Sequence, residues 1–161
     1  MKSQKVLVRR YLRRHPKMSE RVVRSAIKTL ERLGEADNLK YACTIHISPE
    51  DCVSDECASQ VKPIHGFRRG TCTLINIEHR DAIDEVESVA TLQHEAEHAR
   101  DIAKNGIDGV DQKHEIRAHE STIRFLRRWR ARERSAAKRK RIDEVISEEQ
   151  RSIRTIRSSG A

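Results

Sequence analysis

The sequence predicts an α+β fold in which a small mixed sheet lies between helical ends. Two short runs rich in β-branched residues, 40–48 and 71–77, are typical of strands. Helical spacing of apolar residues precedes them at 19–34 and follows them from residue 84 onward. We expect three parts: a basic helical N-terminal segment (1–39), a core (40–123) and a long basic C-terminal helical extension (124–161).

The composition indicates a small soluble protein. The chain has 161 residues, of which 36% are charged and 36% hydrophobic, and its mean hydropathy is -0.78. No apolar stretch reaches the roughly 18 residues that a membrane span needs, which excludes an integral membrane protein. The basic start at 1–17 lacks the apolar region of a secretory signal, so we expect a cytoplasmic protein. One Trp, two Tyr and two Phe argue against a stacking platform for single-stranded nucleic acid.

Charge is distributed unevenly along the chain. Residues 1–40 carry 12 basic and 4 acidic side chains, and residues 41–123 carry 8 basic and 16 acidic ones. Residues 124–141 carry ten basic side chains and a single acidic one, Glu133. An acidic middle between basic ends indicates that the middle differs in function from the ends.

The N-terminal part is predicted to form two helices, 5–14 and 19–34. Ser19 is suited to cap the second helix, and Gly34 stands where a C-terminal cap is expected. The pair is similar to the second and third helices of a winged-helix DNA reader, although ordinary helical hairpins share the pattern. On that interpretation three basic side chains would contact DNA: Arg21, Arg24 and Lys28.

Turn residues and caps divide the rest of the chain. Pro and Gly make 49–70 a loop with a short strand near 61–67. Asp84 can cap a helix in which Glu87 completes a capping box, and this helix ends at Asn105-Gly106. A returning helix then starts near residue 112 and is predicted to continue past residue 140.

The four cysteines are Cys43, Cys52, Cys57 and Cys72. They lack the spacing of a zinc ribbon, so we expect reduced thiols that act as small buried hydrophobic groups. The alternative is a second zinc site in which Cys43 joins His46 and His65.

The chemistry is concentrated in one HExxH motif, residues 94–98, inside the predicted helix. Residues four apart share one face of a helix, so His94 and His98 can bind the same Zn²⁺. Glu95 can take a proton from a metal-activated water as a general base. A catalytic zinc also needs a third protein ligand, and the returning helix carries four candidates: His114, Glu115, His119 and Glu120.

The motif region resembles a family of zinc peptidases, the mitochondrial intermembrane-space metalloprotease that processes an ATP-synthase subunit and its relatives. The similarity lies in HEAEHARD (94–101) and EIRA (115–118), within about residues 71–121. The second segment also resembles that of gluzincins, which implies a minimal zincin fold with Glu115 as the third ligand. The strand at 74–77 would then be the edge strand that pairs with an extended substrate. His119 stands where many gluzincins have an Asp that orients a ligating His.

A second resemblance is to SprT-like proteases, some of which degrade protein crosslinked to DNA. The segment 107–110 followed by His114 is similar to their approach to a histidine ligand. The third ligand therefore stays open, with Glu115 preferred over His114, His119 and Glu120.

Asp101 and Arg117 are further candidates near the motif. Asp101 lies one turn after His98, where it can hydrogen-bond a ligand imidazole or remain a solvated charge. Arg117 and His119 are the candidates for stabilising an oxyanion.

The basic run 124–141 would attract phosphate as a helical surface. The alternative is the solvated face of a helix whose Ile123, Leu126 and Trp129 dock on the domain. The cations that would bind nucleic acid are Arg127, Arg128, Arg130, Lys138, Arg139, Lys140 and Arg141.

These observations predict a zinc metalloendopeptidase that acts on a protein or peptide substrate. His94, His98 and Glu115 would hold Zn²⁺, and Glu95 would be the base. One alternative is a nucleic-acid-binding protein with a structural or vestigial metal site. Another is a SprT-like protease that acts on DNA-bound protein.

Overall fold

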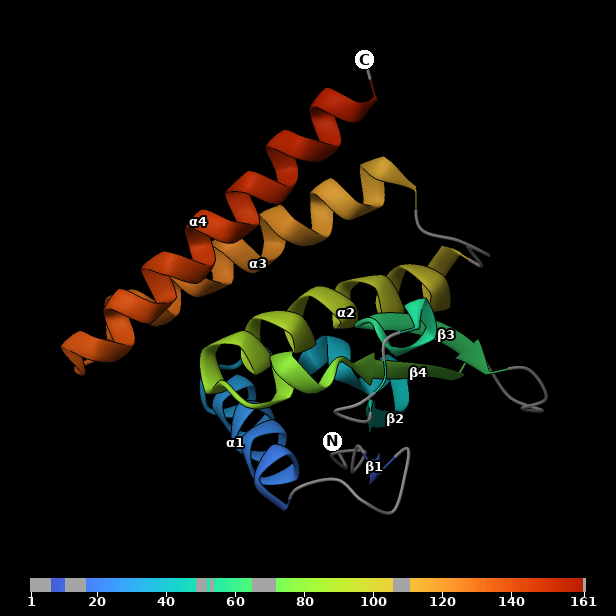
Figure 1. The fold of residues 1–161 in the computed structure, drawn as a ribbon, viewed down its shortest axis with the longest axis horizontal. Helices are drawn as coiled ribbons and strands as arrows, with labels where there is room; N and C mark the ends of the chain where they lie inside the picture. Colours follow the sequence, from blue (N-terminus) through green and yellow to red (C-terminus); the bar gives the residue numbers. More distant parts are fainter. Residues whose placement is uncertain are drawn as a thin grey trace.

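The computed structural model of the chain describes residues 7–10, 17–48, 52, 54–64, 72–105 and 111–160. They form an α+β structure, as the sequence predicts, with one mixed sheet and four α-helices. Helix α2 (Glu85–Asn105) lies against the sheet, with α1 (Lys17–Arg32) beside it (Figure 1). Helices α3 (Gln112–Arg132) and α4 (Ala136–Ser159) cover the side of α2 that faces away from the sheet.

The sheet has four strands in the order β1 (Leu7–Arg10), β2 (Ala42–Ile47), β4 (Cys72–Ile77) and β3 (Gln60–Ile64). The first three are parallel, and β3 runs antiparallel to β4. In the register between β2 and β4, Ile45 lies opposite Ile75 and Ile47 opposite Ile77, and all four side chains are fully buried. The strands predicted at 40–48 and 71–77 and the short strand near 61–67 are thereby confirmed.

The helix predicted at 5–14 is wrong where the structure describes it, because Leu7–Arg10 is strand β1. It pairs in parallel with β2, from Leu7 opposite Thr44 to Arg10 opposite Ile47. A four-residue run has too little periodicity to separate helix from strand, and the free edge of β2 decides for strand. Residues 11–14 lie outside the described ranges. The winged-helix interpretation loses its first helix, and Arg24 pairs with Glu20 at 3.0 Å on the surface of α1.

Helix α1 begins at Lys17, so Ser19 lies inside it and is not its N-cap. Its C-terminal end is the one predicted: Gly34 has a φ of 74°. The N–H of Glu35 donates to the carbonyl of Leu30 at 2.9 Å, and the N–H of Gly34 donates to that of Glu31 at 3.1 Å. This pair of bonds is a Schellman motif, which satisfies carbonyls that the helix end would leave unpaired.

Helix α2 begins at the predicted cap, where Asp84 Oδ1 accepts the N–H of Glu87 at 2.8 Å. The helix is buried on most of its circumference, because the sheet covers one side and the other helices cover the rest. Polar residues such as Ser88 and Gln93 are therefore buried together with the apolar residues whose spacing predicts the helix. Short 3-10 helices precede several of these elements, at Ala36–Tyr41, Asp55–Cys57 and His79–Ala82.

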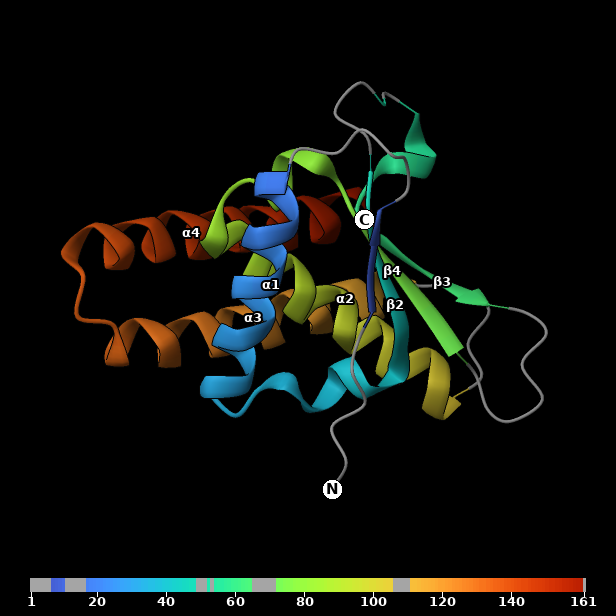
Figure 2. The same ribbon diagram turned by 90° about the horizontal axis from the view of Figure 1, so that it is seen from below.

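The prediction of one helix from residue 112 past residue 140 is wrong. Helix α3 ends at Arg132, residues 133–135 connect the two helices, and α4 runs antiparallel along α3, as Figure 2 shows. Ser135 caps α4 by accepting the N–H of Lys138 at 3.2 Å. The break lets apolar residues of both helices share one core: Phe125, Leu126, Trp129, Ile142, Val145, Ile146 and Ile153. Helix α3 runs across residues 123 and 124, where the sequence places a domain boundary.

Cys43, Cys52 and Cys57 are oxidised, which corrects the expectation of reduced thiols. Cys52 and Cys57 form a disulfide, and Cys43 is also disulfide-bonded. No free cysteine is present in the described part of the chain, so Cys43 offers no thiolate for a second zinc site. His65 of that predicted site lies outside the described residues. Within the same described ranges, we find no helix with the length and apolar character needed to cross a bilayer.

We expect Gly34→Ala to lower the free energy of unfolding by about 1 kcal/mol, because an L side chain is strained at this positive φ. No atom lies within 4 Å of the added Cβ, so the loss comes from the backbone alone. Urea unfolding measures it. Ser25→Ala, at an exposed position inside α1, is the control and should cause no loss. Equal stability of Gly34→Ala and wild type would contradict the cap assignment.

Candidate metal centre

Three side chains from α2 and α3 converge on one point. His94 and His98 lie one turn apart on α2, and their Nε2 atoms are 3.0 Å from each other. Glu115, in the first turn of α3, places Oε2 3.2 Å from the Nε2 of His94 and Oε1 3.3 Å from the Nε2 of His98. The predicted ligand set is thus brought together, and Glu115 is the candidate third ligand that lies against both imidazoles.

The spacing of these atoms suits a zinc ion. Four ligands at 2.0–2.1 Å from Zn²⁺ in a tetrahedron are roughly 3.3 Å from one another. The two imidazole nitrogens are 3.0 Å apart, and each has one oxygen of the Glu115 carboxylate at 3.2 or 3.3 Å, distances that are close to that edge length. Two imidazoles and one carboxylate are also a donor set that catalytic zinc uses. The residues present therefore fit Zn²⁺.

The protonation states favour metal binding as well. Hydrogen bonds from His94 and His98 hold the pKa of Glu115 well below its usual range, so this group is a carboxylate. Burial lowers the pKa of His94, which favours the neutral imidazole. A carboxylate and a neutral imidazole are the forms that bind a cation. The Nδ1 of His98 is buried and has no hydrogen-bond partner among the described residues.

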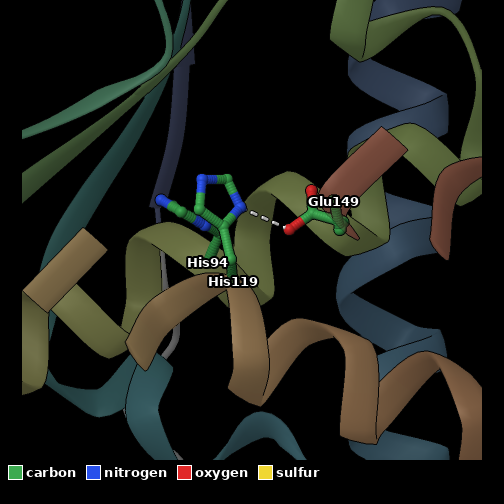
Figure 3. A group of neighbouring side chains, drawn as sticks. All are labelled: His94, His119 and Glu149. Atoms are coloured by element: carbon green, nitrogen blue, oxygen red, sulfur yellow. Dashed lines mark hydrogen bonds and ion pairs between the residues drawn. The ribbon is translucent and has the colours of Figure 1, made fainter. Parts of the chain in front are cut away.

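His119 lies beside this cluster, and Glu149 of α4 holds it there (Figure 3). The His119 and His94 rings are 4.5 Å apart between centroids. The Nδ1 of His119 is 2.7 Å from Glu149 Oε2, and its Nε2 is 3.9 Å from Glu115 Oε2. His94, His119 and Glu149 form a second group with the chemistry to bind a metal.

Glu149 is the site residue that the sequence analysis missed. It is 34 residues from Glu115 in the chain, on a helix that the sequence analysis did not predict as a separate element. The available signal was local: Glu149 lies three residues after Ile146 and four before Ile153, both of which face the core. That spacing places the carboxylate on the inner face of α4.

Glu95 is almost fully buried, with 6% of its surface exposed. Burial, followed by the nearby carboxylate of Glu115, raises its pKa to about 8. Without a cation at the site this group is therefore mostly protonated at neutral pH.

Two candidate ligands lie elsewhere. His114 Nδ1 is 2.5 Å from Asp111 Oδ1 at the N-terminus of α3. Glu120 is exposed and pairs with Arg157 of α4 at 3.2 Å. Neither belongs to the two groups of possible metal ligands in the described part of the chain.

Asp101 is a buried partner of two arginines and not a solvated charge. Its carboxylate accepts a hydrogen bond from Arg117 of α3, and it lies 3.4 Å from Arg100. The pair with Arg117 ties α2 to α3 next to Glu115. The same pair occupies the Arg117 guanidinium, which the sequence suggests as a group that could stabilise an oxyanion.

Glu97, a variable position of the motif, fixes the same helices. Its Oε1 accepts hydrogen bonds of 2.9 Å from Asn38 and from Ser121, and its Oε2 pairs with Arg100 at 2.7 Å. Asn38 and Ser121 thus join two other segments to this buried carboxylate of α2, which makes Glu97 structural.

The strand before the motif helix is not an edge strand. β4 is hydrogen-bonded to β2 on one side and to β3 on the other, so it has no free edge for a substrate. Asn76 of β4 donates to the carbonyls of Cys57 and Ala58 at 3.2 and 2.9 Å, which fixes the segment before β3. The described edge on this side of the sheet is β3.

Five of the seven cations that the sequence suggests for nucleic-acid binding contact the protein itself. Arg128 pairs with Glu35, Arg130 with Asp143 at 2.5 Å, and Lys138 with Glu85 at 3.1 Å. Arg141 lies among four carboxylates: Asp84, Glu87, Glu144 and Glu148. Arg139 donates to the carbonyls of Glu133 and Arg134. Arg127 and Lys140 are exposed.

We expect Glu97→Ala to lower the free energy of unfolding of the metal-free protein by about 2–4 kcal/mol, because it removes a buried acceptor from three donors. Thermal or urea unfolding measures the change. Glu120→Ala removes an exposed carboxylate from a surface pair and should cost less than about 1 kcal/mol. Similar losses in the two variants would show that Glu97 has no structural role of this kind.

No protein-family model matches this chain, and no curated protein or solved structure matches it. The likeness to zinc peptidases rests on residues 94–101 and 115–118 of the chain itself.

Proposed function

We propose that this protein is a zinc-dependent metallopeptidase. The observation that carries the proposal is the convergence of His94, His98 and Glu115. The two Nε2 atoms are 3.0 Å apart, and one carboxylate oxygen of Glu115 lies 3.2 Å from the first and the other oxygen 3.3 Å from the second. With three protein ligands, a tetrahedral ion keeps one position open, which is the arrangement of a catalytic site.

Each residue of the centre has a defined task in this proposal. His94, His98 and Glu115 would hold the zinc, which supplies a Lewis acid that polarises a peptide carbonyl and makes water more acidic. Glu95 accepts the proton of the attacking water and then delivers it to the amine that leaves. Peptide-bond hydrolysis needs both transfers, and one carboxyl group can perform them in turn.

The raised pKa of Glu95 is compatible with this role. A general base is most effective when its pKa is close to the operating pH, and burial raises that of Glu95 to about 8. A divalent cation on the neighbouring imidazoles would favour the ionised carboxylate. Glu95 would then be ready to accept a proton when the centre is loaded.

His119 distinguishes a catalytic site from a structural one. In the tautomer that donates from Nδ1 to the Glu149 carboxylate, the His119 ring carries its lone pair on Nε2. A structural zinc site would use that lone pair as a fourth protein ligand. The Nε2 of His119 is 3.9 Å from Glu115 Oε2, however, which exceeds the separations within the ligand set. This distance favours three ligands, with His119 beside the open position.

The direct test is zinc content combined with proteolysis. We expect about one zinc per chain by elemental analysis, and hydrolysis of an unstructured protein such as casein that stops on chelation. Glu95→Gln should keep the zinc and lower hydrolysis by at least about 100-fold, because the base is lost while the ligands remain. Glu115→Ala should weaken zinc binding.

Two outcomes would contradict the proposal. Wild-type protein that takes up no stoichiometric zinc would exclude the metal centre. Zinc-loaded protein whose activity on casein is the same in Glu95→Gln would exclude Glu95 as the base.

The Glu149→Gln variant tests the number of ligands. With three ligands, we expect the zinc dissociation constant to stay within about threefold of wild type, because Glu149 then contacts no ligand. If His119 were a fourth ligand, loss of its carboxylate partner would weaken zinc binding by about 10- to 100-fold. Competition with a fluorescent chelator measures the constant, and His119→Ala should give the same result as Glu149→Gln.

A further inference from the structure

A groove runs along the surface between α3 and α4, apart from the metal ligands. It has a volume of about 420 Å³, and the residues that line it are Glu120, Ile123, Arg124, Arg127, Gln150, Ile153, Arg154 and Arg157. Four guanidinium groups and one carboxylate give it a net charge of +3. We call it the arginine groove.

The arginine groove holds cations that the protein leaves uncompensated. Arg124, Arg127 and Arg154 are exposed and have no ion-pair partner among the described residues. Arg157 pairs with Glu120 at 3.2 Å, but both side chains are exposed, and such pairs are worth at most about 1 kcal/mol. Arg128, Arg130 and Arg141 of the same basic run are neutralised by carboxylates. Three guanidinium groups without an ion-pair partner among the described residues thus border one groove.

The chemistry of the groove selects a phosphate ligand. Guanidinium groups bind phosphate oxygens in a bidentate manner, and this match is stronger than that of a simple point charge. Arg124 and Arg127 lie three residues apart on α3, as do Arg154 and Arg157 on α4, so each pair shares one helix face. The two pairs border the same groove and can contact several phosphates of one polymer.

The residues that line the groove also indicate which class of polyanion it can bind. None of the lining residues is aromatic, so the groove offers no surface on which unpaired bases could stack. A lipid surface is bound better when apolar side chains can insert next to the cations. The exposed large hydrophobic residue in the described ranges is Ile83, which precedes α2 and does not line the groove. A rigid polymer with regular phosphates fits these features best.

We propose that the arginine groove binds the phosphate backbone of double-stranded nucleic acid without reading its sequence. Four phosphate contacts predict that the logarithm of the binding constant falls with the logarithm of the salt concentration with a slope of about −3.6. DNA and RNA duplexes share this chemistry, and binding to either is expected.

The test is fluorescence anisotropy of a labelled duplex of about 20 base pairs, with the full chain, over a range of salt concentrations. In Arg124→Gln/Arg154→Gln the magnitude of the slope should fall by about 1.8, and the dissociation constant at low salt should rise at least about tenfold. The matched control, Arg128→Gln/Arg130→Gln, removes the same formal charge from cations that are already paired, and its slope should stay within about 0.5 of wild type. Circular dichroism melting checks that both variants fold.

Three results would overturn the proposal. The first is equal loss of binding in the groove variant and the control, which would show that net charge alone is responsible. The second is unchanged duplex binding in the groove variant. The third is groove-dependent binding to phosphatidylcholine vesicles that contain phosphatidylserine, or to polyglutamate, that is tighter than binding to DNA and RNA duplexes.

Discussion

The structure depends on one constraint, which is that a helix carrying many polar groups is buried on most of its circumference. Helix α2 lies between the sheet and the α3–α4 pair, and Glu95, Glu97, His98 and Asp101 are each at most 6% exposed. Buried polar groups are costly unless they are paired. Glu97, His98 and Asp101 find partners on α3, in Ser121, Glu115 and Arg117. The contacts that stabilise the packing of α2 on α3 are therefore the same contacts that shape the candidate metal centre.

Features that depend on a few neighbouring residues are the ones that the sequence predicts well. The one-turn spacing of His94 and His98 needs only a helix, and the cap at Gly34 needs only a residue that tolerates positive φ. The strands β2 and β4 are recognised because each is a short run rich in the β-branched residues Ile and Thr.

Features that depend on distant partners are not visible in the same way. Strand β1 forms because β2 offers a free edge for pairing. Its four residues are too few to show the alternation by which a strand is predicted from sequence. The break at 133–135 separates two segments that are equally helical in composition, so only the shared core reveals that they fold back on each other. Glu149 reaches His119 across that fold, and no local pattern connects the two residues. The number of basic residues likewise does not predict which of them are unpaired. Arg141 and Arg124 contribute equally to the charge of the sequence, but Arg141 lies among four carboxylates. Arg124 has no carboxylate partner among the described residues.

The contribution of α4 to the centre has a consequence for how the protein is made. Synthesis proceeds from the N-terminus, so the motif helix and α3 leave the ribosome before α4 does. Until then Leu126 and Trp129 lack the apolar residues of α4 that cover them, and His119 lacks Glu149. A chain that stops short of residue 149 would keep the three proposed ligands, His94, His98 and Glu115, but not the carboxylate that pairs with His119. The position of His119 thus depends on α4, which is synthesised after the three proposed metal ligands.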